Sequence, residues 1–208
     1  MKVLTDKIEF PNVDETTEDG LLAIGGDLKT ERLILAYKTG IFPWFEDNQP
    51  ILWWSPDPRF VLYPEKLKVS KSMRQVLRNG DFEVSVNKDF SQVINECSRA
   101  KRDGQSGTWI TQSMINAYIE LHKLGYAKSV EVWQDEKLIG GLYGIDLGNG
   151  IFCGESMFSK VSNASKVAFI TYIQNTDYKL IDCQVYTNHL ESLGAEEISR
   201  NEFLNIIN

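Results

Sequence analysis

Residues 129–155 read SVEVWQDEKLIGGLYGIDLGNGIFCGE, and they indicate more about the fold than any other stretch of the chain. Apolar and polar residues alternate over the first five positions, which is typical of a half-buried strand. A polar turn at 135–137 then leads into a glycine-rich strand over 138–145. The Gly-Asn-Gly at 148–150 predicts a second tight turn before a strand over 151–155. We therefore expect an antiparallel meander.

Helices and further strands are predicted on both sides of this meander. Before it, Ser70 and Asp89 are suited to cap two helices, and a third helix is expected over 112–124. After it, a helix over 163–175 precedes a strand over 179–185. A meander, a helix and another strand in this order predict an α+β domain with a mixed sheet. That order suits the acyltransferase fold of the acetyltransferase superfamily (GNAT-type).

The residues before this domain have a different character. A strand or turn at 20–27 precedes a helix for which Thr30 is a suitable N-cap, and residues 41–58 concentrate tryptophans and prolines. Because prolines fix the backbone, these aromatic side chains either form the core of a small lobe or line a binding site. The pattern changes after Pro64. We therefore predict a small N-terminal lobe over 1–64 and an acetyltransferase-like domain over 65–208.

Composition excludes several classes of protein. The 208 residues are 42% hydrophobic and 25% charged, which is ordinary for a globular chain and excludes a wholly disordered one. No apolar run is long enough to cross a membrane, and the N-terminus lacks an apolar leader, so we expect a soluble, cytoplasmic protein. Three scattered cysteines without a CxxC and two histidines predict neither a disulfide framework nor a metal site.

Charge is distributed unevenly along the chain. The net charge of -7 argues against a general nucleic-acid coat. Residues 59–80 nevertheless hold six basic side chains and one acid. In the helix predicted to follow Ser70, three of these basic residues share one face: Lys71, Arg74 and Arg78. This face is either simply solvated or binds phosphates.

Three polar residues on predicted strands are candidates for chemistry. Asp182 and Gln184 are expected to point to one face of the strand over 179–185. They indicate either an edge strand with a wet face or a polar pair that projects into a cleft. Glu155, at the end of its strand, is either a surface carboxylate or a group that grips a cationic substrate. A nucleophilic pair of Cys183 and His189 is disfavoured, because the cysteine is expected to face the core.

Seven segments, in this order, resemble the leucyl/phenylalanyl-tRNA–protein transferase family. They are GLLAIGGDL (20–28), GIFPWF (40–45), ILWWSPDPR (51–59), GTWIT (107–111), FCGESMFS (152–159), NASK (163–166) and LIDCQV (180–185). The resemblance implies transfer of leucine, phenylalanine and, less readily, methionine from aminoacyl-tRNA. The acceptor it implies is the α-amine of proteins with N-terminal arginine or lysine, which are thereby marked for degradation. It further implies that no metal is needed. We expect no cofactor and no membrane partner, and the oligomeric state is left open, with a monomer favoured.

The same resemblance assigns binding residues. It implies an apolar pocket for the aminoacyl side chain, formed by Leu142, Phe152, Met157 and Ile181. It implies stacking of the terminal adenosine of the tRNA on Trp44 and Trp109, with Tyr37 and Tyr118 as supporting candidates. The basic face of Lys71, Arg74 and Arg78 would contact phosphates of the acceptor stem, largely without regard to sequence.

Catalytic roles follow from the resemblance in the same way. The family places an Asp/Gln pair at the reacting amine, and Asp182 and Gln184 match it. Because a neutral amide is a very poor base, we expect Gln184 to orient the amine and Asp182 to polarise or anchor Gln184. Glu155 is expected to help hold the acceptor N-terminus. The proton would leave through water or the terminal ribose hydroxyl.

Two other functions compete with this interpretation. An acetyl-CoA-dependent N-acetyltransferase would need a glycine-rich loop at a helix N-terminus to hold a pyrophosphate. The corresponding segment, 159–165, contains no glycine. A tRNA-binding module without catalysis would use the same basic face and aromatic residues. Stabilisation by CoA and aminoacyl transfer to peptides distinguish the three functions.

Overall fold

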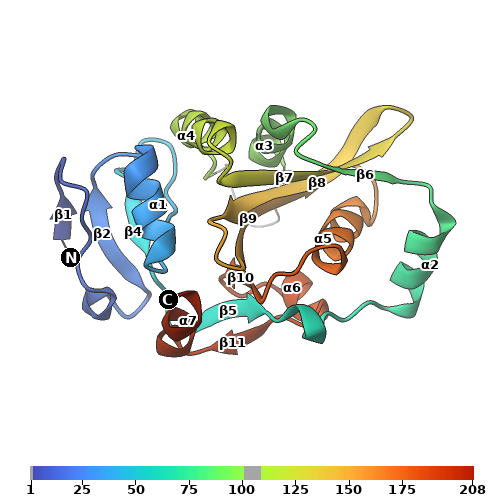
Figure 1. Cartoon of the computed structure of the whole chain (residues 1–208). Helices are drawn as coiled ribbons and strands as arrows, with labels where there is room; N and C mark the ends of the chain where they lie inside the picture. The colour runs from blue at the N-terminus through green and yellow to red at the C-terminus, as the bar shows by residue number, and fades with distance from the viewer. Residues whose placement is uncertain (1, 101–108) are drawn as a thin grey trace.

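The computed structural model describes residues 2–100 and 109–208, which fold around two β-sheets (Figure 1). The smaller sheet has the strand order β1-β2-β4-β3. β1 runs parallel to β2, and the other neighbours are antiparallel. The four strands are β1 (Lys2–Leu4), β2 (Leu21–Gly25), β3 (Phe42–Pro43) and β4 (Leu52–Trp54), and the helix α1 (Thr30–Lys38) lies between β2 and β3 in the chain. A 3-10 helix, η1, covers Val13–Glu15.

The larger sheet has the order β11-β5-β10-β9-β8-β7-β6 and contains the expected meander. β7, β8 and β9 pair antiparallel in sequence, whereas β10 pairs parallel with β9. The predicted α+β class with a mixed sheet is therefore confirmed. The strands are β5 (Arg59–Leu62), β6 (Glu83–Val86), β7 (Ala127–Gln134), β8 (Lys137–Asp146), β9 (Ile151–Ser159), β10 (Leu180–Gln184) and β11 (Glu196–Ile198).

The chain passes from the small sheet to the large sheet earlier than the residue pattern indicates. β5 lies N-terminal to the expected boundary at residue 64, yet it pairs antiparallel with both β10 and β11. All four of its residues are buried. One hydrophobic core also spans both sheets, since Trp53 of β4, Val61 of β5 and Tyr143 of β8 belong to the same buried cluster. β5 therefore brings Arg59 into the large sheet.

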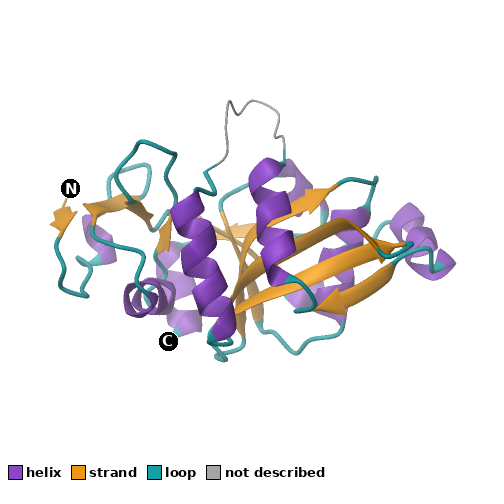
Figure 2. Cartoon of the chain, turned by 90° about the horizontal axis from the view of Figure 1, so that it is seen from above, coloured by secondary structure: helices purple, strands orange, loops and turns teal. Residues whose placement is uncertain are grey.

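Helices cover both faces of the large sheet (Figures 1 and 2). α3 and α4 pack side by side on one face, and α5 packs on the other. The expected caps of α2 and α3 are present, because Met73 N donates to Ser70 Oγ (3.1 Å) and Gln92 N to Asp89 Oδ1 (2.9 Å). The helices are η2 (Pro64–Lys66), α2 (Lys71–Asn79), α3 (Phe90–Arg99), α4 (Gln112–Lys123), α5 (Ala164–Gln174), α6 (Asn188–Ser192) and α7 (Arg200–Ile207).

Glycine in β8 allows α5 to approach the sheet closely. A Cβ atom on Gly140 would lie 2.5 Å from the Cβ of Ala164, the first residue of α5. Such a contact is too short for any other residue, so glycine is needed at this position for packing. Separately, no helix among the described residues is long and apolar enough to span a bilayer.

Candidate functional site

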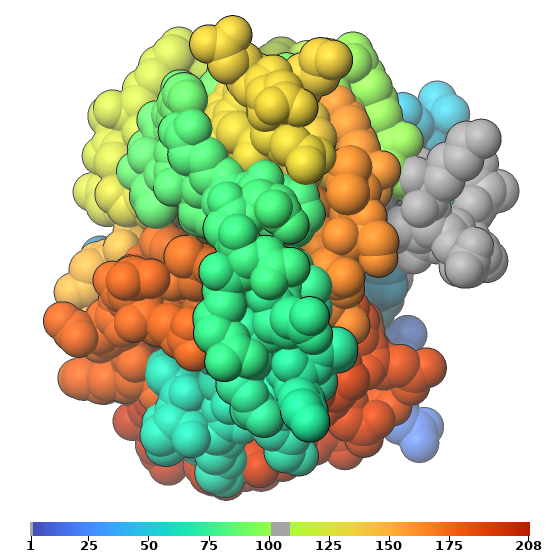
Figure 3. All heavy atoms as spheres, turned by 90° about the vertical axis from the view of Figure 1, so that its right-hand side faces the viewer, coloured from blue at the N-terminus to red at the C-terminus, as the bar shows by residue number. Residues whose placement is uncertain are grey.

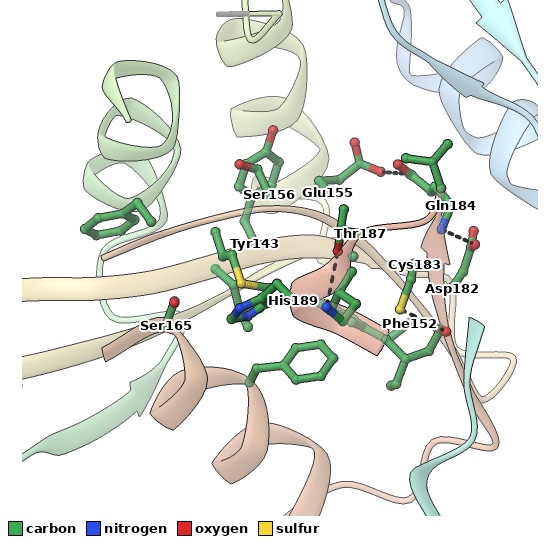
Figure 4. Close-up of a pocket in the computed structure, with 18 of the residues that line it drawn as sticks. Tyr143, Phe152, Glu155, Ser156, Ser165, Asp182, Cys183, Gln184, Thr187 and His189 are labelled. Atoms are coloured by element: carbon green, nitrogen blue, oxygen red, sulfur yellow. Dashed lines mark hydrogen bonds between the residues drawn. The ribbon is translucent and has the colours of Figure 1, made fainter. Parts of the chain in front are cut away.

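A cavity of about 670 Å³ lies between β9, β10, α5 and α6 (Figure 4). It exists because β9 and β10 separate: their pairing ends at Cys153 and Asp182, although β9 continues to Ser159. Both strands are irregular at this point. β9 shifts register against β8 so that Glu155 is an extra residue, and β10 shifts against β5 so that Cys183 is one. Bulges of this kind bend a strand and redirect its side chains.

One wall of the cavity is apolar and contains all four residues expected there. Leu142 pairs directly with Met157 across β8 and β9, and Ile181 pairs with Phe152 across β10 and β9. Directly paired residues share a face of the sheet, and the bulge at Glu155 restores Phe152 and Met157 to the same face. The structure therefore brings together Leu142, Phe152, Met157 and Ile181.

Two further apolar residues of the wall were not expected from the sequence. Phe169 of α5 and Leu190 of α6 also line the cavity. The ring of Phe152 packs edge-on against Tyr172 of α5, with 5.1 Å between ring centroids, which fixes its orientation. The helical positions were missed because the pattern of α5 is apolar on all sides and marks no single face. The wall is thus contributed by both the sheet and the helices.

Glu155 is a buried carboxylate with three hydrogen-bond donors. It is only 8% exposed, and its Oε1 accepts from Tyr37 Oη (2.8 Å) and Gln184 Nε2 (2.8 Å). Its Oε2 accepts from Tyr118 Oη at 3.1 Å. Burial raises the pKa of Glu155 to about 7, although the three hydrogen bonds oppose this shift. The interpretation of Glu155 as a surface carboxylate is therefore wrong.

Tyr37 and Tyr118 lie beneath the cavity rather than in its wall. Tyr118 is 0% exposed, and the hydroxyl groups of the two tyrosines are hydrogen-bonded to each other as well as to Glu155. Burial raises the pKa of both phenols well above the ordinary value, so both stay protonated and supply two hydrogens to this cluster of hydroxyl and carboxylate oxygens. Because neither ring has a free face, the stacking role expected of Tyr37 and Tyr118 is corrected to one of holding Glu155.

Asp182 forms a buried ion pair with Arg59 of β5. Its Oδ1 accepts from Arg59 Nε (2.8 Å) and its Oδ2 from Arg59 Nη2 (2.7 Å). Oδ1 also accepts from the backbone N–H of Gln184 at 3.0 Å. Since β10 lies between β5 and β9, the interpretation of its polar pair as a wet edge strand is wrong. Both Asp182 and Gln184 are buried and line the cavity.

Gln184 adopts an unusual backbone conformation. Its φ angle is +65°, in the left-handed region, which costs an L-residue roughly 1–2 kcal/mol. Together with the bulge at Cys183, this conformation turns the Gln184 side chain toward Glu155. Asp182 therefore anchors Gln184 through its backbone, and the side-chain amide of Gln184 bonds to Glu155.

The two tryptophans expected to stack on the terminal adenosine both line the cavity. Trp44 follows β3 and is 37% exposed, and Trp109 precedes α4. The backbone oxygen of Trp44 accepts a 2.7 Å hydrogen bond from Trp54 Nε1 of β4, which ties the Trp44 backbone to the small sheet. The Trp44 ring also lies 5.9 Å, centroid to centroid, from the ring of Trp54. Stacking of the adenosine on Trp44 and Trp109 remains a prediction.

The basic residues of α2 do not reach the cavity. The face of α2 that carries Lys71, Arg74 and Arg78 is exposed, whereas Met73 on the other side is buried. Arg74 Nη1 donates to Val69 O (2.7 Å), and the α2 region crosses one side of the molecule (Figure 3). The structure therefore places α2 apart from the cavity lining, and its contact with phosphate remains a prediction.

Arg59, the partner of Asp182, was not singled out as a site residue from the sequence. It follows the WWSPDP string and precedes the apolar Phe60, Val61 and Leu62. A charged residue that opens an apolar strand needs a partner, and that pattern was the available signal. By contrast, the expected inert character of Cys183 fits its burial, which raises the pKa of the thiol. Among the described residues, no group of three or more His, Cys, Asp or Glu is placed to hold a metal ion.

Comparison with known proteins gives consistent matches. A family model described as leucyl/phenylalanyl-tRNA protein transferase matches residues 61–208, and the model of its N-terminal domain matches residues 26–57. The leucyl/phenylalanyl-tRNA–protein transferase of Flavobacterium johnsoniae is 62% identical, over 100% of this chain and 99% of that protein. The protein of the same name from Pseudomonas putida is 55% identical, over 95% of this chain and 89% of that protein.

Solved structures give more distant likenesses. A GCN5-related N-acetyltransferase from Kribbella flavida has a TM-score of 0.39 and 10% identity, covering 80% of this chain and 60% of that one. A conserved protein of unknown function from Bacteroides thetaiotaomicron has a TM-score of 0.43 and 13% identity, covering 89% and 64%. TM-scores this low give no information about the reaction.

Proposed function

The chain belongs to the leucyl/phenylalanyl-tRNA–protein transferase family, an aminoacyltransferase family, and we propose that it transfers leucine, phenylalanine and, less readily, methionine to proteins with N-terminal arginine or lysine. The donor is Leu-tRNA or Phe-tRNA, and the acceptor is the α-amine of the protein. The added residue marks the acceptor for degradation in the cytoplasm. One observation carries the proposal: an apolar wall and a buried pair of Glu155 and Gln184 share one cavity.

The apolar wall is suited to the donor side chain. Leucine, phenylalanine and methionine are bulky and uncharged, so each gains free energy when it leaves water for an apolar pocket. The cavity offers Leu142, Phe152, Met157 and Ile181 for this purpose. Charged or small side chains would lose hydration or leave space unfilled. Trp44 and Trp109 would hold the terminal adenosine by stacking, and α2 would contact phosphates farther along the acceptor stem.

The reaction is attack of the acceptor amine on the ester that joins the amino acid to the tRNA. A bond forms between the amine nitrogen and the ester carbon, and the bond from that carbon to the ribose oxygen breaks. A free α-amine has a pKa of roughly 7.7–8.0, so part of it is already neutral near pH 7. The enzyme must therefore orient the amine and accept one proton from it.

Gln184 and Glu155 divide these two tasks. Gln184 Nε2 donates to Glu155, which leaves the amide oxygen of Gln184 as an acceptor for an N–H of the substrate amine. Glu155 lines the same cavity, and its pKa of about 7 suits a group that accepts a proton near neutral pH. The proton then passes to the ribose oxygen, directly or through water. Asp182 anchors Gln184, because Asp182 Oδ1 accepts the backbone N–H of Gln184.

Peptide acceptors with different first residues test the proposal. Purified protein is incubated with radiolabelled Leu-tRNA and with peptides that begin with Arg, Lys, Asp or Ala. We expect label on the Arg and Lys peptides alone. Label on Asp peptides would retain the transferase and overturn the acceptor rule. Bound tRNA with no labelled peptide would instead favour a tRNA-binding module.

A further inference from the structure

Arg59 is buried in the middle of the molecule, where a charge is costly unless it is fully paired. It is 1% exposed and lies on β5, between β10 and β11. Its guanidinium group donates to Asp182 through Nε and Nη2 and to Gly40 O through Nη1, the last at 3.2 Å. Phe42 and Phe203 pack against it, with ring centroids 4.8 Å and 4.5 Å from Cζ. Arg59 is therefore fixed in position by several parts of the chain.

This contact fixes Asp182 in turn. Both carboxylate oxygens of Asp182 bond to the planar fork of Arg59, and this geometry determines the plane of the carboxylate. Oδ1 then accepts the backbone N–H of Gln184. A lysine would supply the charge at a single point and would leave the carboxylate free to rotate. The orientation of Asp182 therefore depends on a guanidinium at residue 59.

Gln184 needs such an anchor because its backbone is left-handed. A glutamine relaxes readily from φ +65° to an extended conformation unless surrounding contacts prevent it. Relaxation would turn its side chain away from Glu155, to which Nε2 now donates at 2.8 Å. A series of contacts thus runs from Arg59 through Asp182 and Gln184 to Glu155.

We propose that Arg59 is a positioning residue for aminoacyl transfer, which holds Gln184 in its left-handed conformation by fixing the Asp182 carboxylate. The inference rests on the proposed function, since Gln184 is the group that orients the amine there. Arg59 does not line the cavity, whose lining includes Trp44 and Trp109, and it lies on β5 rather than on α2. Its loss therefore slows the chemical step and leaves binding of aminoacyl-tRNA intact.

Arg59→Lys tests the inference, with Arg32→Lys as a matched control. Arg32 is also fully buried and ion-paired, at 3.2 Å from Asp27, but it belongs to α1 and donates to Asp27 and Thr5 O rather than to Asp182. We expect both variants to lower the melting temperature. Arg59→Lys alone should lower kcat, by about tenfold or more, because small misplacements of reacting groups are costly. KM for Leu-tRNA should stay within about twofold of the wild-type value.

The kinetic result has clear contrary outcomes. If Arg59→Lys keeps the wild-type kcat, or loses no more kcat than Arg32→Lys does, Arg59 has only a structural role and the inference is overturned. A raised KM with unchanged kcat would overturn it equally. Should Arg59→Lys not fold, Phe203→Leu keeps the ion pair but removes one ring that packs on the guanidinium. It should lower kcat by a smaller factor, and an unchanged kcat would contradict the inference.

NMR spectroscopy of the amide groups separates this inference from the proposed function. In Arg59→Lys we expect the backbone N–H and side-chain NH₂ resonances of Gln184 to shift, whereas Arg32→Lys should leave them in place. Unchanged Gln184 resonances in Arg59→Lys would overturn the inference. Wild-type protein that transfers no amino acid, but whose Gln184 resonances depend on Arg59, would overturn the proposed function and support the positioning role.

Discussion

Gln184 Nε2 donates to Glu155 Oε1 at 2.8 Å, and this hydrogen bond links β10 to β9 where the two strands have stopped pairing. Each residue lies at or beside a bulge, so neither would face the other in a regular sheet. The bond holds an amide and a carboxylate together at the edge of an apolar cavity. A substrate amine that enters there meets an oriented acceptor and a proton acceptor at once.

Removal of the Gln184 amide should slow transfer without loss of the fold. Gln184→Gly keeps the left-handed backbone at no steric cost, whereas Gln184→Ala keeps the cost that the wild-type glutamine already has. Both variants should lose kcat by about a hundredfold, because the amine is no longer oriented. Gln184→Gly should be more stable than Gln184→Ala by roughly 1 kcal/mol, because only glycine avoids the cost of the left-handed backbone. Single-turnover transfer rates and melting temperatures measure the two effects, and full turnover in Gln184→Gly would remove the assigned role.

The pH dependence of kcat should follow the ionisation of Glu155. Its pKa is raised to about 7, so the carboxylate that accepts the proton predominates only above that pH. We therefore expect kcat at saturating substrates to rise as pH increases through about 7. Glu155→Gln should lower kcat and abolish this rise. A wild-type profile that is flat over roughly one pH unit on either side of neutrality would contradict the assignment.

Met157 should influence the choice between leucine and phenylalanine. Met157→Ala removes side-chain atoms from the apolar wall and so enlarges the pocket. The smaller leucyl group then no longer reaches atoms that the phenyl ring still touches. We expect kcat/KM for Leu-tRNA to fall about tenfold more than that for Phe-tRNA. Met73→Ala provides the control, since Met73 is a buried methionine of α2 outside the cavity. An unchanged ratio in Met157→Ala would exclude Met157 from the donor pocket.

Salt dependence should reveal whether α2 contacts phosphates. Lys71→Ala, Arg74→Ala and Arg78→Ala should each weaken tRNA binding. Each should also reduce the slope of the logarithm of the binding constant against the logarithm of salt concentration, by about 0.7–0.9 for each phosphate that is no longer neutralised. Transfer at saturating tRNA should be unaffected, because α2 lies apart from the cavity. Lys137→Ala, an exposed lysine at the start of β8, is the control. Slopes identical to that control would identify the α2 face as merely solvated.

Local sequence patterns predicted the regular elements well. Alternation marked β7, a glycine-rich segment between two turns marked β8, and the capping residues Ser70 and Asp89 marked the starts of α2 and α3. The polar residues singled out on β9 and β10, which are Glu155, Asp182 and Gln184, line one cavity. These features depend on neighbours within a few residues, which the sequence displays directly.

The exact site depends on relations that no local pattern contains. The pair of Arg59 and Asp182 is separated by 123 positions, and only the strand order shows that β5 and β10 are neighbours. The bulges at Glu155 and Cys183 each redirect a strand by one residue, which a strict alternation cannot reveal. Tyr37 was a supporting candidate for stacking, but its burial under Glu155 is a consequence of packing between α1 and α4.

Mass spectrometry of the peptide product tests the central claim most directly. The protein is mixed with Leu-tRNA and a peptide that begins with arginine, and a matched peptide with an acetylated N-terminus serves as the control. The account predicts that the free peptide gains the mass of one leucyl residue, located at its N-terminus by fragmentation, and that the acetylated peptide is unchanged. No mass gain on the free peptide, or an equal gain on the acetylated one, would contradict transfer to the α-amine.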